Sequence, residues 1–229
     1  MIETTLRRVS PRAHQHPRRQ LQALFDHNFH GNRVLDAGAG WELPIHLPPE
    51  THLTLLDISA EALNQNGDQT IIDDVQTHRF PPESFDAVLC WWVLEHLSRP
   101  ANAIERLAEA LRPGGLLVIA VPYRWGLKAL VTRLTPYRFH VWVARRSNPN
   151  AGMPGCGPFP TVLHRDITPT RLKQIALANG LEVAYGNTFA EPPPVLRHAW
   201  NGLGASVKLV TFGRYDPRLS EHTAVFRKR

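Results

Sequence analysis

The chain has 229 residues, 43% of them hydrophobic, which is enough to bury one substantial core and short for a second full domain. Its 26 lysines and arginines outnumber its 20 aspartates and glutamates, giving a formal net charge of +6. No run of about 18 apolar residues is present, and the arginine-rich first twenty residues lack the apolar stretch of a secretion signal. We therefore expect a cytoplasmic protein that neither spans a membrane nor is secreted.

The few cysteines and the twelve histidines favour neither a disulfide framework nor a metal centre. Cys90 lies in an apolar run and Cys156 lies in a Gly/Pro-rich loop. No spacing of histidine and cysteine is typical of metal ligands. We expect a reducing compartment and no bound metal.

Helix-like and strand-like segments alternate over the first half of the chain. A helix is expected from Pro17 to His30, and a second from Ser59 to Asn66 with Ser59 as its N-cap. A third helix follows Pro100 and ends at the breaker Arg112-Pro113-Gly114-Gly115. Strands are expected over 33–36, 53–56, 70–72, 87–89 with an apolar continuation to 94, and 116–121. This alternation predicts a parallel α/β sheet.

The pattern changes after Val121. Apolar residues at helical spacing predict helices over 126–134 and 135–143, and a Gly/Pro loop covers 148–160. A further helix begins at Thr168-Pro169 and ends at Asn179-Gly180. Two last strands are expected over 181–184 and 223–226. Residues 122–165 therefore form an insert after the fifth strand, where we expect a lid on the substrate side of the sheet.

A glycine turn follows the first predicted strand. Gly38 and Gly40 let the backbone turn sharply and approach a ligand without a Cβ in the way. The dinucleotide pattern G-x-G-x-x-G is incomplete, because Leu43 stands where its third glycine would be. The turn therefore indicates a nucleotide-like ligand but disfavours one bound through a pyrophosphate.

Asp57 ends the second predicted strand, 21 residues after Asp36. A carboxylate in this place can accept hydrogen bonds from both ribose hydroxyls of an adenosine-containing ligand. It can equally be a carboxylate that stabilises the start of a helix through the helix dipole. The neighbouring glycine turn favours the ligand.

Four further segments, taken together with these features, carry a family resemblance. They are Asp73-Asp74-Val75, Phe85-Asp86-Ala87-Val88, Val93-Leu94-Glu95-His96-Leu97 and Leu111-Arg112-Pro113-Gly114-Gly115. In this order and spacing they resemble the class I S-adenosylmethionine-dependent methyltransferases, in particular the broad group with Leu-Glu-His after the fourth strand. The resemblance covers about residues 33–121. It implies a methyltransferase enzyme with S-adenosyl-L-methionine as cofactor and a Rossmann-like α/β fold, a seven-stranded, mostly parallel sheet with helices on both faces. Residues 1–229 are then a single methyltransferase domain.

The resemblance also implies contacts between particular residues and the cofactor. Asp36, Gly38 and Gly40 would surround its methionine part. Asp57 would bind the ribose, and Ile58 would stack on the adenine.

Three more contacts follow from the same resemblance. Asp74 would bond the adenine amino group, and the amide of Val75 would reach a ring nitrogen. Cys90, at the end of the fourth strand, would line the pocket near the reactive methyl group. A solvated turn is the alternative reading of Asp73 and Asp74.

The segment after the glycine turn departs from the family pattern. Glu42 stands at the third glycine position of the family, and Pro44, Pro48 and Pro49 disfavour the usual helix after the first strand. We expect this wall of the pocket to be built differently. A carboxylate at position 42 would repel the carboxylate of the cofactor. The alternative is therefore a binding protein that retains the fold and has lost the cofactor.

Several polar residues allow both a catalytic and a structural reading. Glu95 and His96 form an apparent acid/base pair, although in this family context we expect them to anchor the helix against the sheet. His140 and His164 flank the divergent segment. Either can act as a general base on an acceptor hydroxyl or be a partly exposed structural histidine. No catalytic residue is assigned from the sequence.

The insert has an uneven charge. No Asp or Glu occurs between Ala110 and Arg165, whereas eight cationic residues do: Arg112, Arg124, Lys128, Arg133, Arg138, Arg145, Arg146 and Arg165. The stretch is either a solvated basic face or a surface for an acidic partner such as an anionic membrane.

The same insert sets our expectation for the methyl acceptor. Its arginines and aromatic residues predict a small or amphiphilic acceptor, with a hydroxyl of a sugar, a glycolipid or another secondary metabolite preferred. The alternative is a nucleic-acid methyltransferase, which is less favoured because no Asn-Pro-Pro-Tyr-type motif follows the fourth strand.

Overall fold

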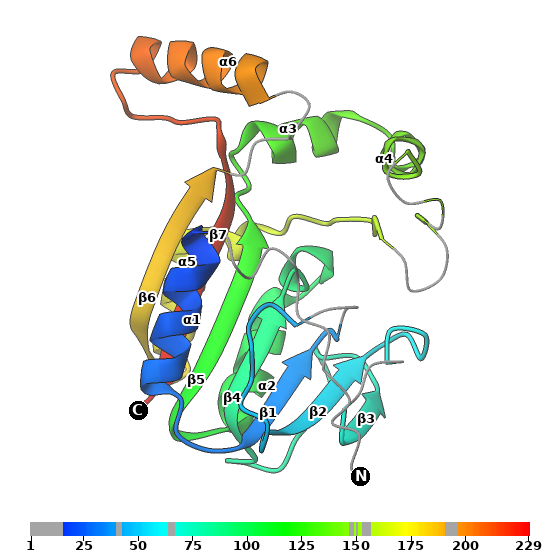
Figure 1. Ribbon diagram of the computed structural model, residues 1–229, viewed down its shortest axis with the longest axis vertical. Coiled ribbons are helices and arrows are strands. Elements are labelled where there is room, and N and C mark those ends of the chain that lie inside the picture. Colours follow the sequence, from blue (N-terminus) through cyan, green and yellow to red (C-terminus); the bar gives the residue numbers. More distant parts are fainter. Residues whose placement is uncertain are drawn as a thin grey trace.

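Seven strands form one sheet in the computed structural model, which describes residues 16–39, 43–63, 67–146, 149, 151–152, 157–190 and 197–229 (Figure 1). The strands are β1 Arg33–Ala37, β2 His52–Asp57, β3 Gln69–Ile72, β4 Phe85–Trp91, β5 Leu111–Pro122, β6 Leu181–Ala190 and β7 Leu219–Lys228. Their order is β3-β2-β1-β4-β5-β7-β6, and of these seven strands β7 runs in the direction opposite to the other six. The predicted seven-stranded, mostly parallel, Rossmann-like sheet is confirmed.

Helices cover both faces of this sheet, as predicted (Figure 1). The α-helices are α1 His16–Asn28, α2 Pro100–Ala110, α3 Leu127–Leu134, α4 Tyr137–Ala144, α5 Pro169–Ala178 and α6 Arg197–Val210. Two short 3-10 helices are η2 Leu94–His96 and η3 Arg165–Ile167. Helix α1 lies on one face, whereas α2 and α5 lie on the other.

The face under α1 is closed by side chains one helical turn apart. Leu21, Phe25 and Phe29 are buried there, and the two phenylalanine rings stack with centroids 4.7 Å apart. They join Val34 of β1 and Val118 of β5 in one apolar cluster. Burying each such side chain stabilises the fold by about 1.5–3 kcal/mol.

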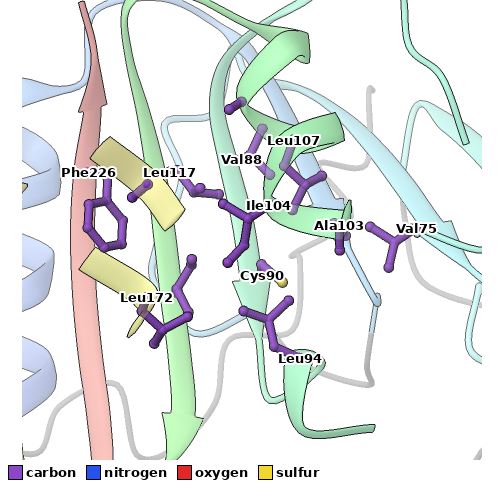
Figure 2. Close-up of a cluster of buried hydrophobic side chains, with 14 of the residues drawn as sticks. Val75, Val88, Cys90, Leu94, Ala103, Ile104, Leu107, Leu117, Leu172 and Phe226 are labelled. Atoms are coloured by element: carbon purple, nitrogen blue, oxygen red, sulfur yellow. The ribbon is translucent and has the colours of Figure 1, made fainter. Parts of the chain in front are cut away.

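The opposite face is closed by α2, whose predicted apolar periodicity is confirmed. Ala103, Ile104 and Leu107 have no exposed surface and pack over β4 and β5. Figure 2 shows Ile104 and Leu107 directed toward Val88 of β4 and Leu117 of β5. These strands are buried on both sides, which explains why their sequences are continuous apolar runs.

Asp86 joins the start of three strands and connects two of the motifs that carry the family resemblance. One carboxylate oxygen accepts the amides of Asn32 and Arg33, both at 2.8 Å. The other lies 2.8 Å from Nε of Arg112, in the Pro-Gly-Gly segment. The carboxylate has 3% of its side chain exposed, so these contacts replace the water that a charge needs when it is buried. The two motifs thus form one structural unit.

The Pro-Gly-Gly segment loops out of strand β5 rather than preceding it. Leu111 pairs with Phe85 and Leu116 pairs with Ala87, so residues 112–115 bulge between two paired positions. Gly114 supports the bulge with a left-handed φ of +79°. The predicted end of the helix is confirmed, but the strand already begins at Leu111.

Two predicted elements are wrong in part. The helix expected over 59–66 is replaced over 59–63 by turns, in which the amides of Ala62 and Leu63 donate to the carbonyls three residues before them. Residues 64–66 lie outside the described part. The apolar continuation of the fourth strand ends at Trp91, because Trp92 adopts a φ of +59° that a strand cannot contain. As expected from its prolines, the described segment 43–51 after β1 contains no helix.

Three helices lie together beyond the carboxyl ends of the parallel strands (Figure 1). Helices α3 and α4 belong to the insert and confirm its predicted helices, whereas α6 was not predicted. Among the described residues, no helix is both long enough and apolar enough to cross a membrane.

Candidate functional site

The glycine turn lies at the carboxyl ends of β1 and β2, where parallel sheets bind ligands. The amides of Gly38 and Ala39 both donate to the carbonyl oxygen of Leu56, at 2.7 and 3.0 Å. Gly38 has a φ of +83°, and an added Cβ would lie only 2.2 Å from Cγ2 of Val93. A glycine is therefore required at position 38 both by the turn and by the chain that follows β4. Gly40, predicted with it, and Glu42 lie outside the described residues.

Asp36 is a buried carboxyl group directly before this turn. Only 3% of the residue is exposed, and burial together with the nearby Asp57 raises its pKa to about 7. The structure thus brings two of the predicted site carboxylates close enough to repel each other.

Asp57 and Ile58 present a polar and an apolar surface side by side. The Asp57 carboxylate is half-buried and accepts the amide of Ser59 at 2.8 Å. Burial raises its pKa, while hydrogen bonds from the amides of Ser59 and Ile58 act in the opposite direction. Ile58 beside it is 75% exposed. A half-buried carboxylate next to a free apolar side chain suits a ribose with an adjoining flat base.

Asp73 and Asp74 lie at the end of the neighbouring strand β3. The amide of Asp73 donates to the carbonyl of Asp57 at 3.1 Å, which holds the two strand ends together. Both carboxylate oxygens of Asp74 accept from the side chain of Gln76, at 3.0 and 3.1 Å. Asp74 is therefore part of an ordered turn, and a ligand amino group would share its oxygens with Gln76. The Val75 side chain is buried in the core.

Cys90 lies inside the core and not on an open surface. Its side chain has no exposed area and sits between Ile104 and Leu94 (Figure 2). Burial, with smaller contributions from Glu95 and Asp36, raises the pKa of the thiol. The thiol therefore stays protonated at neutral pH and packs as a small apolar group.

A family comparison bears on this arrangement. The family described as Methyltransferase domain matches residues 10–185, more than half of the chain. The chain belongs to this family. The predicted relationship to the class I S-adenosylmethionine-dependent methyltransferases is thereby confirmed, and S-adenosylmethionine is the cofactor of this class.

Curated relatives and solved structures agree with this assignment. A ubiquinone biosynthesis O-methyltransferase of Xylella fastidiosa is 31% identical over 104 residues, 39% of this chain and 42% of the relative. A tRNA (carboxymethyluridine(34)-5-O)-methyltransferase of Arabidopsis thaliana is 31% identical over 116 residues, 46% of this chain and 28% of the relative. The chain thus spans less than half the length of both relatives. An S-adenosylmethionine-dependent methyltransferase of Mesorhizobium loti shares the fold, with a TM-score of 0.57 and 16% identity over 92% of this chain and 97% of that chain.

The described residues fit the cofactor of this family. The carboxylate of Asp57 and the exposed Ile58 match a ribose and an adenine, and the turn at Gly38 follows directly at the end of β1. These residues lie on adjacent strand ends, because β1 and β2 pair in register from Arg33 with His52 to Ala37 with Leu56. The assignment of individual contacts remains a prediction.

The chain after β4 anchors the end of the insert to the methyltransferase sheet. The carbonyl of Glu95 accepts the amides of Val162 and Leu163, at 2.8 and 3.1 Å. Nδ1 of His96 lies 2.7 Å from the carbonyl oxygen of Pro160. The Leu-Glu-His segment therefore has an anchoring role, as expected, but it holds residues 160–163 of the insert through these bonds.

The Glu95 side chain belongs to a buried charged group that sequence reasoning missed. It is 1% exposed, and burial together with Glu221 raises its pKa to about 8, while Lys128 acts in the opposite direction. A carboxyl group with this pKa is mostly protonated, and therefore mostly uncharged, at neutral pH. Glu221 of β7 was missed because the last strand was expected to begin only at Thr223, leaving position 221 in a polar connection.

The two candidate histidines make structural contacts. Nε2 of His140 lies 2.9 Å from the Thr135 hydroxyl oxygen, at the junction of α3 and α4. Nδ1 of His164 accepts the amide of Asp166 at 3.3 Å and caps η3. These contacts favour the structural reading of both histidines.

A hollow of about 340 Å³ lies at the other end of the strands. Its lining includes Arg33, His52 and Gln69, the first residues of β1, β2 and β3. It therefore lies opposite the strand ends that carry the glycine turn and Asp57, and we do not assign the cofactor to it.

Proposed function

We propose that this methyltransferase transfers a methyl group from S-adenosylmethionine to a small or amphiphilic acceptor, with a hydroxyl of a sugar, a glycolipid or another secondary metabolite preferred. The observation that carries the proposal is the surface beyond the carboxyl ends of β4 and β5. There the insert presents the aromatic side chains of Trp125, Tyr137, Phe139 and Trp142, each at least 40% exposed, among arginines. Aromatic faces suit sugar rings and apolar chains, and guanidinium groups suit phosphate or carboxylate.

The chain's own residues would bind and orient rather than activate. When bound, S-adenosylmethionine supplies an electrophilic methyl carbon. Asp57 would hold the ribose, and the backbone of the Gly38 turn would lie beside the methionine part. Residues 122–165 would act as an acceptor-side insert of a single methyltransferase domain, placing the acceptor and excluding water. The expected cytoplasmic location stays a prediction.

Cofactor binding is the first test of the proposal. We expect the purified chain to bind S-adenosylmethionine in calorimetry, and Asp57→Ala to weaken binding about 10- to 100-fold, because charge-assisted hydrogen bonds to the ribose are lost. Glu50→Ala, which removes an exposed carboxylate at the other end of β2, is the matched control and should bind like the wild type. Equal binding by Asp57→Ala would refute the site, and no binding by the wild type would refute the function.

The acceptor class needs a separate measurement. The wild type can be incubated with methyl-labelled S-adenosylmethionine and either a cellular extract of lipids and small molecules or total tRNA. We expect label in the first fraction, and label found in the tRNA alone would overturn the proposed acceptor.

A nucleic-acid acceptor is the second candidate, favoured by the named tRNA methyltransferase relative and by the basic insert. It predicts RNA binding that weakens steeply as salt concentration rises. If the chain does not bind RNA even at low salt concentration, a nucleic-acid acceptor is excluded.

A further inference from the structure

Helices α3 and α4 and residues 197–214 form a cap at the end of the molecule beyond the parallel strands (Figure 1). Two distant parts of the chain are tied together there. The amide of Leu127, at the start of α3, donates to the carbonyl of Pro217 at 2.8 Å, and the Tyr215 hydroxyl donates to the carbonyl of Trp125. Lys208 of α6 lies 3.6 Å from Asp216. The connection after α6 is therefore bound to the start of the insert.

The end of α6 exposes an apolar tip. Leu209, Val210 and Phe212 are 79%, 76% and 90% exposed. Phe212 adopts a left-handed φ of +52°, followed by Gly213 at +77°, so the chain reverses with the aromatic ring at its turn. Solvent exposure of three neighbouring large apolar side chains is costly for a protein in water.

Helix α4 adds a second unpartnered apolar surface to the cap. None of its residues is buried. The rings of Phe139 and Trp142 stack with centroids 5.7 Å apart, and Arg146 lies over the Trp142 ring at 3.4 Å. The helix therefore carries an ordered aromatic pair that is half-exposed, Phe139 to 43% and Trp142 to 54%.

All the charged side chains of the cap helices are cationic. The sequence has 20 acidic residues, but none between positions 110 and 165 and none between 192 and 215. Lys208 and Arg214 flank the apolar tip, and exposed Arg133 and Arg138 lie on α3 and α4. The two segments that the fold brings together thus share the same charge.

We propose that the cap docks on an anionic lipid bilayer, with the apolar tip entering the headgroup region and the cationic residues contacting lipid phosphates. Apolar side chains bordered by lysine and arginine are the combination that interfacial membrane contacts use. A nucleic acid would satisfy the cations but would leave Leu209 and Val210 in water. A second copy of the chain would bring one cationic face against another.

Cosedimentation of the full chain with vesicles tests the proposal without depending on enzyme activity. Vesicles of phosphatidylcholine alone and of phosphatidylcholine mixed with phosphatidylglycerol are compared. We expect binding to the anionic vesicles. Phe212→Ser should weaken it about tenfold or more, because the variant has no phenylalanine side chain to bury in the bilayer. Arg133→Gln and Arg138→Gln should each weaken it about fivefold.

Matched controls lie outside the cap. Leu177→Ser removes an exposed apolar side chain from α5, and Arg79→Gln removes an exposed cation from the connection before β4. Both should bind vesicles like the wild type. Absence of binding to anionic vesicles, or equal binding by Phe212→Ser, would overturn the proposal. A dimer that requires Phe212, seen by sedimentation velocity without vesicle binding, would assign the surface to self-association instead.

Discussion

Replacing Gly38 with alanine tests whether the glycine turn is required by packing. Alanine at a φ of +83° costs about 1–2 kcal/mol, because Cβ crowds the backbone in the left-handed region. The added Cβ would also lie 2.2 Å from Cγ2 of Val93, far inside a normal carbon contact of about 3.5–4.0 Å. Relieving that overlap should cost about 1–3 kcal/mol more. We expect a total loss of about 2–5 kcal/mol in the free energy of unfolding.

Gly114→Ala is the matched control, because Gly114 has nearly the same φ of +79° and no atom lies within 4 Å of an added Cβ. It should show the backbone cost alone. The variant Val93→Ala removes the clashing Cγ atoms and leaves Cβ at 3.1 Å. The double variant Gly38→Ala/Val93→Ala should therefore lose less free energy of unfolding than the sum of the losses of the two single variants, by about 1–3 kcal/mol.

Urea denaturation measures these differences, and titration with S-adenosylmethionine measures the effect on the site. Gly38→Ala should bind the cofactor more weakly, whereas Gly114→Ala should bind it like the wild type. Equal stability of the Gly38→Ala and Gly114→Ala variants, or additive losses in the double variant, would refute the packing argument.

Three further predictions concern buried carboxyl groups. Burial raises the pKa of Asp36 from 3.8 to about 7 in the folded state, so the free energy of unfolding falls as pH rises between those values. The Asp36→Asn variant should lack up to about 4 kcal/mol of this pH-dependent fall, as measured by urea titrations from pH 4 to pH 7. Glu95, raised from 4.5 to about 8, behaves with the same sign, so Glu95→Gln should gain stability relative to the wild type at pH 9 compared with pH 5, and an equal difference at both would contradict its burial. Asp86→Ala should cost about 3–5 kcal/mol in thermal unfolding, because Arg112 loses its partner and two backbone amides lose their acceptor; a loss below about 1 kcal/mol would show that Asp86 does not join the strands.

The strands were predictable because they are buried on both faces, so that their sequences are continuous apolar runs. This holds for β1, β2, β4 and β5, whose predicted positions agree with the structure to within a few residues. The predicted strand ends were wrong where a single backbone angle ends the strand, as the positive φ of Trp92 does after β4. A sequence pattern carries no signal for a positive φ at tryptophan.

Helix α6 was missed because its residues are poor helix formers. Asn201, Gly202, Gly204 and Ser206 all lower helix propensity, so the segment looked like a connection. The structure shows one reason for a glycine here, since a Cβ at Gly204 would lie 2.1 Å from Cγ of Arg218. A close approach between helix and chain cannot be inferred from the helix sequence alone.

The sequence indicated where along the chain the candidate site residues lie, but not the hydrogen bonds that their side chains make. Asp36, Asp57 and Asp74 lie on neighbouring strand ends, because β1, β2 and β3 are neighbours in the sheet. The link from Asp74 through Gln76 to the amide of Arg99, at 2.8 Å, requires a side chain to reach the start of α2. The sequence offers no period or spacing from which such a contact follows.

The charge pattern of the cap shows why only part of a binding surface can be predicted from a sequence. The absence of acidic residues over 110–165 was evident, but the second acid-free segment, 192–215, gains meaning only when the fold binds the chain after α6 to the start of α3, through Leu127 and Pro217. The cap also lies beyond the same end of the sheet as the candidate cofactor site, the end at which the parallel strands finish (Figure 1). The two proposals are then linked in space: a protein docked through this cap would face the bilayer with its acceptor side. An amphiphilic acceptor could reach the methyl donor without leaving the membrane surface, whereas a tRNA would have to approach through the lipid-facing side.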